Sequence, residues 1–284
     1  LVLLVVIAIL ATSNSYAQAS FETIGGLRYL IDSDAKTATL AANNGDEKYS
    51  GNIVVPEKVK ASDGMEYPVT AFAANAFKDC DGLQSIIIPS SVTSLGNSCF
   101  YKCYGLTNIT IPTSVTSLCE NCFYGCYGLT SITIPSSVTS LGECCFYDCS
   151  DLTSITIPSS VTSLSDGCFS YCKSLTSIKI PDGVTNIGSW AFLGCESLTS
   201  INIPNSVTNI REETFYGCKS LTSIKIPNSV TNIGSWAFAS CESLTCINIP
   251  DCVTHISDRT FVGCKKLPSK IKSDIINRFG EEVF

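Results

Sequence analysis

The sequence predicts a β-rich solenoid of the α/β type, in which 23-residue coils stack and pair their strands into a parallel sheet. One segment of 23 residues recurs eight times, and its copies begin at Leu83, Leu106, Leu129, Leu152, Leu175, Leu198, Leu221 and Leu244. The copies keep their apolar residues at the same positions, and a Phe and a Cys recur near the end of each copy. A repeat of this length cannot bury its apolar face alone, so only stacking of neighbouring copies can stabilise it.

Residues 1–19 are predicted to be a signal peptide that is truncated at its start. Residues 1–10 are apolar throughout, and Ala17-Gln18-Ala19 has the small-x-small pattern of a signal-peptidase site. A buried N-terminal strand is the alternative interpretation. The apolar run is shorter than the about 20 residues that cross a bilayer. We therefore expect no transmembrane segment in the mature chain and a secreted or cell-surface location.

Residues 20–48 are predicted to form an N-terminal β-hairpin cap. Over residues 21–42, apolar and polar residues alternate on both sides of Asp32-Ser33-Asp34, a pattern typical of two strands joined by a turn. Such a hairpin would cover the open edge and the apolar end of the first coil, as the terminal caps of repeat proteins do.

Residues 49–82 are interpreted as a degenerate first repeat with an insertion loop. Ile53 and Val55 match the first strand of the repeat, and Phe77 matches the Phe near its end. About ten additional residues lie around positions 62–68, and insertions in solenoids usually fall in loops on one face. This loop is a candidate for function, with a protruding loop that has no role as the equal alternative.

Residues 83–267 are predicted to form eight complete coils. With the first Leu as position 1, Ile residues at positions 4 and 6 alternate with polar residues, which indicates a strand with one buried face. Pro at position 7 ends this strand, and apolar residues at positions 10 and 13 suggest a second short strand. The segment with Phe at position 18 and Cys at position 21 would close the coil as a turn or short helix. The Phe residues, expected to stack in the core, are Phe77, Phe100, Phe123, Phe146, Phe169, Phe192, Phe215, Phe238 and Phe261.

Residues 268–284 are predicted to form a C-terminal cap. A short helix from Ser273 to Phe279 would cover the last coil with its apolar residues. Near this end, Trp190 and Trp236 lie 46 residues apart in the same local sequence, which indicates a duplicated unit of two coils. We expect these two side chains to pack between coils.

The 17 cysteines are predicted to be mainly thiols in the core. Those at position 21 would stack at the inter-strand spacing of about 4.8 Å with parallel side chains, whereas a disulfide needs Cβ atoms at about 3.8 Å that point toward each other. A disulfide from Cys119 is an alternative. No metal is expected, because Cys119 and Cys122 form the only Cys-x2-Cys pair. The position-21 residues are Cys80, Cys103, Cys126, Cys149, Cys172, Cys195, Cys218, Cys241 and Cys264.

Composition argues against several classes of function. The net charge is −7 and the basic residues are dispersed, so we expect no nucleic-acid partner, which would require a cluster of Lys and Arg. The only histidine is His255, and the serines belong to the repeat rather than to a unique cluster. A hydrolase needs a nucleophile, a base and an orienting group, so the chain is predicted not to be an enzyme and to need no cofactor.

The pattern Leu-x-x-Ile-x-Ile-Pro-x-x-Val-x-x-Ile-x-x-x-x-Phe-x-x-Cys resembles the BspA-like leucine-rich repeats, and the match covers about residues 49–267. The resemblance implies a curved leucine-rich-repeat solenoid with a parallel sheet on an exported or surface protein. It also implies adhesion to host matrix proteins, to other cells or to surfaces. The chain departs from the commoner leucine-rich pattern at position 9, where Ser, Gly or Cys252 stands in place of a regular Asn or Cys column.

Two exposed rows are candidate partner surfaces. Position 5 of the first strand should face outward beside the Ser residues at position 3, with solvated strand residues that bind nothing as the alternative. Tyrosines near the end of the coil could form an aromatic platform for a sugar or a protein. The position-5 residues are Ile87, Thr110, Thr133, Thr156, Lys179, Asn202, Lys225 and Asn248, and the tyrosines are Tyr101, Tyr124 and Tyr147 with Tyr104 and Tyr127.

These observations lead to two hypotheses for function. The first is a non-enzymatic, exported or cell-surface binding protein whose solenoid face adheres to a host or bacterial protein or cell-surface ligand. The second is a carbohydrate-binding or structural scaffold module of a surface assembly.

Overall fold

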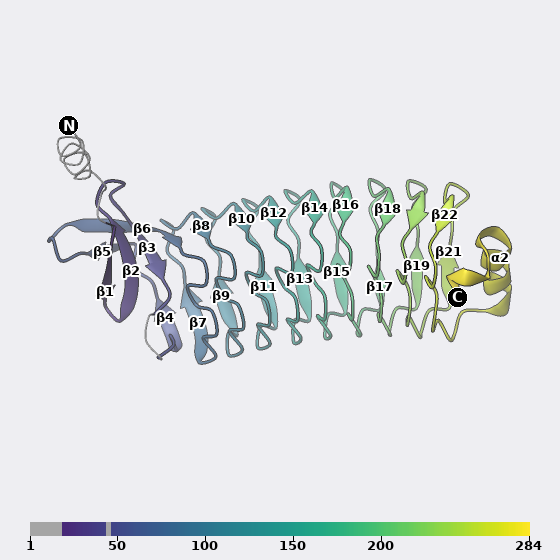
Figure 1. Cartoon of the computed structure of the whole chain (residues 1–284), viewed down its shortest axis with the longest axis horizontal. Coiled ribbons are helices and arrows are strands. Elements are labelled where there is room, and N and C mark those ends of the chain that lie inside the picture. The colour runs from purple at the N-terminus through teal and green to yellow at the C-terminus, as the bar shows by residue number, and fades with distance from the viewer. Residues whose placement is uncertain (1–18, 44–46) are drawn as a thin grey trace, which may run out of the picture.

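The computed structural model describes residues 19–43 and 47–284, which form an elongated stack of coils with a β cap at the N-terminal end and a helix at the C-terminal end (Figure 1). The signal peptide expected over residues 1–19 lies outside the described residues except for Ala19. Within the part of the chain that is described, no helix is long and apolar enough to cross a membrane.

Two rows of parallel strands run along the stack (Figure 1). Their register places equal positions of neighbouring coils beside each other, as Ile132 beside Ile155 and Leu118 beside Leu141. The predicted solenoid of 23-residue coils with parallel sheets is therefore confirmed. The first row contains β4 (Gly51–Val54), β7 (Leu83–Ile87), β9 (Asn108–Thr110), β11 (Ser131–Thr133), β13 (Ser154–Thr156), β15 (Ser177–Lys179), β17 (Ser200–Ile201), β19 (Ser223–Lys225) and β21 (Cys246–Asn248). The second row contains β8 (Ser94–Leu95), β10 (Ser117–Leu118), β12 (Ser140–Leu141), β14 (Ser163–Leu164), β16 (Asn186–Ile187), β18 (Asn209–Ile210), β20 (Asn232–Ile233) and β22 (His255–Ile256).

The alternation of apolar and polar residues explains the first row. Ile155 and Ile157, at positions 4 and 6, are buried, whereas positions 3 and 5 of the same strand are exposed. Pro158 follows at position 7 and has no amide hydrogen for the ladder, so the strand ends there. Its carbonyl instead accepts a hydrogen bond from the N–H of Val161 at 3.0 Å, which turns the chain toward the second row.

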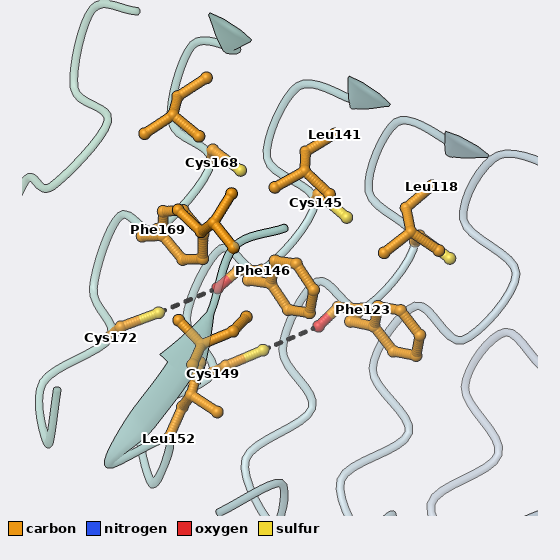
Figure 2. Packing of buried hydrophobic residues seen from close by; sticks show 14 of the residues in the cluster. Leu118, Phe123, Leu141, Cys145, Phe146, Cys149, Leu152, Cys168, Phe169 and Cys172 are labelled. Carbon is orange, nitrogen blue, oxygen red and sulfur yellow. Dashed lines mark hydrogen bonds between the residues drawn. The ribbon is translucent and has the colours of Figure 1, made fainter. Parts of the chain in front are cut away.

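The Phe residues at position 18 form a stacked spine inside the coils (Figure 2). The rings of Phe146 and Phe169 have centroids 5.5 Å apart and planes that differ by 2°. Cys172 donates its S–H to the Phe146 carbonyl of the preceding coil at 3.2 Å, and this carbonyl also accepts the N–H of Cys149 at 3.2 Å. The same bond from a position-21 thiol recurs in each coil from Cys103 to Cys264.

Hydroxyl groups at three other positions also join neighbouring coils. At position 2, Thr153 donates its N–H at 3.0 Å and its hydroxyl at 3.2 Å to the Thr130 carbonyl of the preceding coil. At position 9, the Ser137 hydroxyl donates to the Val115 carbonyl at 2.7 Å. Thr residues at position 11 repeat the arrangement of position 2 in several coils. These hydroxyls are therefore part of the stacking interface.

All 17 cysteines lie in the described residues and all are free thiols, which confirms the expectation of core thiols. The buried cysteines include those at position 21 and a second group at position 17. Of the 17 cysteines, only Cys246 is exposed. Burial raises the pKa of the core thiols well above the usual value, as for Cys126 and Cys172. The core thiols are therefore protonated and act as small apolar side chains with one weak donor.

The N-terminal segment has three strands where a two-stranded hairpin is expected. The additional turn is at Gly25-Gly26. Both residues have a positive φ, at 59° and 82°, which glycine adopts more readily than other residues. At the expected turn, Asp32 Oδ1 accepts the N–H of Ala35 at 2.8 Å. The third strand pairs in parallel with the first coil and so covers its edge. The strands are β1 (Ser20–Ile24), β2 (Leu27–Asp32) and β3 (Thr37–Ala41).

The insertion around residues 62–68, expected to be a loop, is part of a β-hairpin, in which its first residues form the turn and its last residues begin the second strand. Asp63 stabilises its turn, because one carboxylate oxygen accepts the N–H of Met65 at 2.8 Å and the other accepts the hydroxyl of Tyr67 at 2.6 Å. The polar and apolar residues that follow alternate as in a strand, and they extend the sheet of the cap. The paired strands are β5 (Lys58–Lys60) and β6 (Glu66–Phe72).

The C-terminal segment covers the last coil with α2 (Ser269–Phe279) and the short 3-10 helix η1 (Glu281–Val283). The helix begins four residues earlier than expected, directly after Pro268. Ile275 is buried against the last coil. Phe284 continues the spine, because its ring lies 5.5 Å from that of Phe261.

The two tryptophans differ in their packing. Trp236 packs between coils as expected, because its ring lies 6.2 Å from that of Tyr216 in the preceding coil and 5.2 Å from the Arg259 guanidinium of the next coil. Trp190 is 42% exposed. Both residues have a positive φ, at 57° and 58°. They therefore occupy a left-handed turn position outside the core.

Replacing Phe169 by Ala should lower the free energy of unfolding by about 3–5 kcal/mol, because it removes a ring stacked on Phe146 and Phe192 and leaves a cavity. Urea unfolding followed by circular dichroism measures this loss. Thr156→Ala is the control at an exposed position of the same coil and should change the free energy by less than about 0.5 kcal/mol. Equal losses in the two variants would contradict a stacked core spine.

The stability of the folded chain should fall as the pH rises above about 9. Unfolded cysteines ionise near pH 8.5, whereas burial raises the pKa of core thiols such as Cys126 and Cys172. The unfolded chain therefore releases protons that the folded chain retains, and high pH favours unfolding. Urea unfolding between about pH 7 and pH 10 measures the slope, which Cys246→Ser at the surface should leave unchanged. A flat profile would show that the thiols are accessible.

Candidate partner-binding surface

Position 5 of the first strand row forms one exposed line along the solenoid, which we call the strand surface. Register pairs place Ile87 beside Thr110 and Thr156 beside Lys179. The line extends past the predicted candidates to Val54, which pairs with Ile87 in the degenerate first coil. All its members are exposed, and they are Val54, Ile87, Thr110, Thr133, Thr156, Lys179, Asn202, Lys225 and Asn248.

The hydroxyls of the strand surface differ from the other hydroxyls of the repeat. Those at positions 2, 9 and 11 donate to carbonyls of the preceding coil. In contrast, the side chains of Thr110, Thr133 and Thr156 make no hydrogen bond to any other residue that the structure describes. These three hydroxyls are therefore available to a partner, and stacking of the coils does not require them.

Two hollows open where the strands of the later coils end. The first has a volume of about 340 Å³ and is lined by Thr156, Lys179 and Asp182 among others. The second, of about 130 Å³, is lined by Asn202, Lys225 and the same Asp182. Each hollow therefore contains one lysine of the strand surface, and one carboxylate borders both.

The walls of these hollows combine apolar and polar groups. Ile157 and Pro181 contribute to the first hollow, and Ile203 and Pro204 contribute to the second. The two isoleucines are core residues at position 6 and are almost completely buried. A polar side chain with an aliphatic stem fits the first hollow, because the stem can lie on the apolar wall while its end reaches the lysine. The exposed wall of the second hollow is mainly polar.

The two lysines are not neutralised within the described part of the chain. The ion pairs found there lie elsewhere, as at position 22, where Lys219 Nζ is 3.1 Å from a Glu196 carboxylate oxygen. Neither Lys179 nor Lys225 takes part in one. These ammonium groups are therefore available to a partner, although the Asp182 carboxylate borders both hollows.

The candidate tyrosines form a second row, but their rings stack on one another. The centroids of Tyr101 and Tyr124 are 4.7 Å apart, and those of Tyr124 and Tyr147 are 4.5 Å apart. Both faces of Tyr124 are thus covered by its neighbours. Tyr104 and Tyr127 form a separate stacked pair at 4.8 Å. The row presents ring edges and hydroxyls rather than the open ring faces of a platform.

The surroundings of these rings suppress their ionisation. Burial, followed by the neighbouring Tyr124, raises the pKa of Tyr147 to about 12. Burial and the Asp148 carboxylate raise that of Tyr127 to about 12 as well. The tyrosine row is therefore uncharged near neutral pH and offers hydroxyls as donors and acceptors.

Residues with catalytic or metal-binding chemistry do not converge. Across residues 19–43 and 47–284, no group of three or more His, Cys, Asp or Glu side chains is placed to hold a metal ion. The ring of His255 lies 3.2 Å from the Ser257 hydroxyl, and this contact is exposed. The hollows beside the strand surface contain no cysteine or histidine.

Val54 belongs to the strand surface and Asp182 borders its two hollows, but neither is among the predicted candidates. Val54 lies between Ile53 and Val55, whose match to the repeat would have assigned it to position 5. Asp182 is at position 8, where the earlier coils have Ser or Thr, so the change to a charged residue is a signal in the sequence. Only the structure shows that it borders both hollows.

Comparison with known proteins agrees with this architecture. Residues 70–199 and 185–284 match the family model described as BspA type Leucine rich repeat region (6 copies). No curated protein matches the chain.

Several solved structures are similar, and three of them are compared by their sequence identity and coverage. A leucine rich cell surface protein from Faecalibacterium prausnitzii A2-165 shares 25% identity at a TM-score of 0.44, over 93% of this chain and 98% of that chain. A leucine rich repeat protein from T. pallidum shares 22% identity at a TM-score of 0.52, over 90% and 95%. A leucine-rich repeat protein from Bacteroides ovatus ATCC 8483 shares 24% identity at a TM-score of 0.48, over 93% and 98%. The likeness to the T. pallidum protein concerns the fold alone.

Proposed function

Because this chain belongs to the BspA type leucine-rich repeat family, we propose that it is a non-enzymatic, exported or cell-surface binding protein that adheres to a partner protein through the strand surface. Leucine-rich repeat proteins act in protein–protein interaction, and a solenoid provides the long repetitive face that such interaction uses. The apolar residues 1–10 and the Ala17-Gln18-Ala19 sequence support export.

The observation that carries this proposal is the division of the polar side chains. The stack uses the hydroxyls at positions 2, 9 and 11 for its own hydrogen bonds. The side chains of Thr133, Thr156, Lys179 and Lys225 remain exposed, and the two lysines border hollows. A row of exposed groups that folding does not require is where a partner can bind without cost to the core.

A carbohydrate-binding or scaffold module is the second candidate, and Tyr127 is the observation that favours it. This ring is 37% exposed at the edge of its stacked pair. Sugars bind well to open aromatic faces, but the faces of Tyr124 are covered by Tyr101 and Tyr147. The tyrosine row therefore supports a sugar site less well than the strand surface supports a protein site.

Charge reversal on the strand surface should weaken adhesion. The mature chain is tested for binding to a panel of immobilised extracellular-matrix proteins and to intact cells, and Lys179→Glu with Lys225→Glu should lower the binding by about tenfold. Lys173→Glu is the control, because this lysine is also exposed but lies in the turn segment of its coil, outside the strand surface. Binding that is unchanged in the double variant would exclude the strand surface.

A glycan array tests the second candidate. We expect no specific signal from the chain, because the stacked tyrosines leave few ring faces for a sugar. A signal restricted to sugars and lost in Tyr124→Ala and Tyr127→Ala would reject protein adhesion as the main function. Circular dichroism of the two variants shows whether the solenoid is retained.

A further inference from the structure

The chemical character of the strand surface changes along the solenoid. Its N-terminal end is apolar, with Val54 at 65% and Ile87 at 56% exposure. Three threonines follow in the middle, and the C-terminal end alternates lysine with asparagine. Because one residue of each coil contributes to the line, a partner that lies along the axis meets an apolar, a hydroxyl and a cationic section in turn.

The apolar end is a contiguous patch rather than two scattered residues. Val54 and Ile87 pair directly in the ladder of β4 and β7, so their side chains lie next to each other on the same face. The next three coils have Thr at this position, which shows that the strand does not need an apolar residue there. Adjacent exposed aliphatic side chains favour an apolar group of a partner.

The distance between the two lysines of the cationic end determines how far apart the acidic side chains of a ligand must be. Lys179 and Lys225 are two coils apart, which at the inter-strand distance corresponds to about 10 Å. A polypeptide in the polyproline II conformation advances about 3.1 Å per residue and completes one turn in three residues. Side chains three residues apart therefore point to the same side and match the two lysines. The hollow beside Lys179 has an apolar wall for an aliphatic stem, whereas the hollow beside Lys225 is lined mainly by polar groups. Both would receive Glu side chains that extend to the ammonium groups.

The two ends together define an orientation. Ile87 and Lys179 are four coils apart, or about 19 Å, which is the length of roughly six residues, or two turns, of a polyproline II segment. A segment that places an apolar side chain against Ile87 would therefore reach the first hollow about six residues later.

We propose that the strand surface binds an extended acidic segment of a partner protein, which lies along the solenoid axis. Its acidic side chains, three residues apart, enter the hollows beside Lys179 and Lys225, and an apolar side chain about six residues away contacts Val54 and Ile87. This rests on the proposed function and specifies the chemistry of the partner. A nucleic acid fits less well, because its phosphate backbone requires a larger cluster of Lys and Arg than these two lysines.

Variants for the test can be taken from neighbouring coils, where the same positions already have the replacing residue. Lys179→Asn and Lys225→Asn copy Asn202, and Ile87→Thr copies Thr110. Asp182→Asn copies Asn205 and removes the negative charge that borders both hollows. These substitutions leave the core unchanged, so loss of folding does not obscure the result.

The probe is a fluorescent peptide with the sequence Leu-Val-Thr-Ser-Thr-Ser-Glu-Ser-Thr-Glu, compared with one in which both Glu are Gln. Fluorescence anisotropy at low salt should show at least about tenfold tighter binding of the Glu peptide. Each lysine variant should weaken this binding about threefold to fivefold, and Ile87→Thr should weaken it as well. Asp182→Asn should strengthen it about twofold, and Lys173→Asn should leave it unchanged.

Equal binding of the Glu and Gln peptides, or binding that does not respond to the lysine variants, would overturn the proposal. A heparin fragment that binds while the Glu peptide does not would also overturn it, in favour of an anionic glycan. If the peptide fails but matrix proteins still bind in a manner that depends on Lys179 and Lys225, protein adhesion stands and the acidic segment is rejected. If both fail, the two proposals are rejected together.

Discussion

Every coil buries a turn around its Phe, and the carbonyl of this residue lies where water cannot supply a hydrogen bond. One donor is the cysteine N–H three residues later in the same coil, and the second is the thiol of the next coil, as for Phe146 with Cys149 and Cys172. A buried carbonyl without partners is costly. A thiol suits this site because it is a small apolar group that still has one donor. The spine, the thiol column and the parallel rows are consequently one arrangement, in which each coil completes its neighbour.

This arrangement also determines which residues are available for function. Ser and Thr are abundant, but their roles follow from their positions in the coil. Those at positions 2, 9 and 11 are bound to carbonyls, while those at position 5 face solvent without a partner among the described residues. The strand surface can therefore vary from Val54 to Asn248 in apolar character, hydroxyl content and charge, because no contact between coils depends on it.

Periodicity was sufficient to predict both strand rows, the spine and the outward direction of position 5, because each follows from the spacing of apolar residues. The turn segment was not predictable in the same way. Position 16 has a positive φ in every coil, yet it contains residues as different as Asn75, Cys144 and Trp190. Hydrogen bonds between coils hold this conformation, so glycine is not required there and occurs in one coil, as Gly167. Likewise, the role of Asp182 depends on two hollows formed by neighbouring coils, and the stacking of Tyr124 depends on side-chain directions that spacing alone does not specify.

Because neighbouring coils bond through the same contacts throughout, gain or loss of one coil leaves every type of contact intact. The residues of the strand surface on either side would only move by one rung, about 4.8 Å. Lys179 and Lys225 are separated by the same 46 residues as Trp190 and Trp236, so the duplication that copied the tryptophans also accounts for the second lysine. In such a protein the length of the recognised ligand can evolve in whole steps through recombination, whereas its chemistry at each step changes by single substitutions.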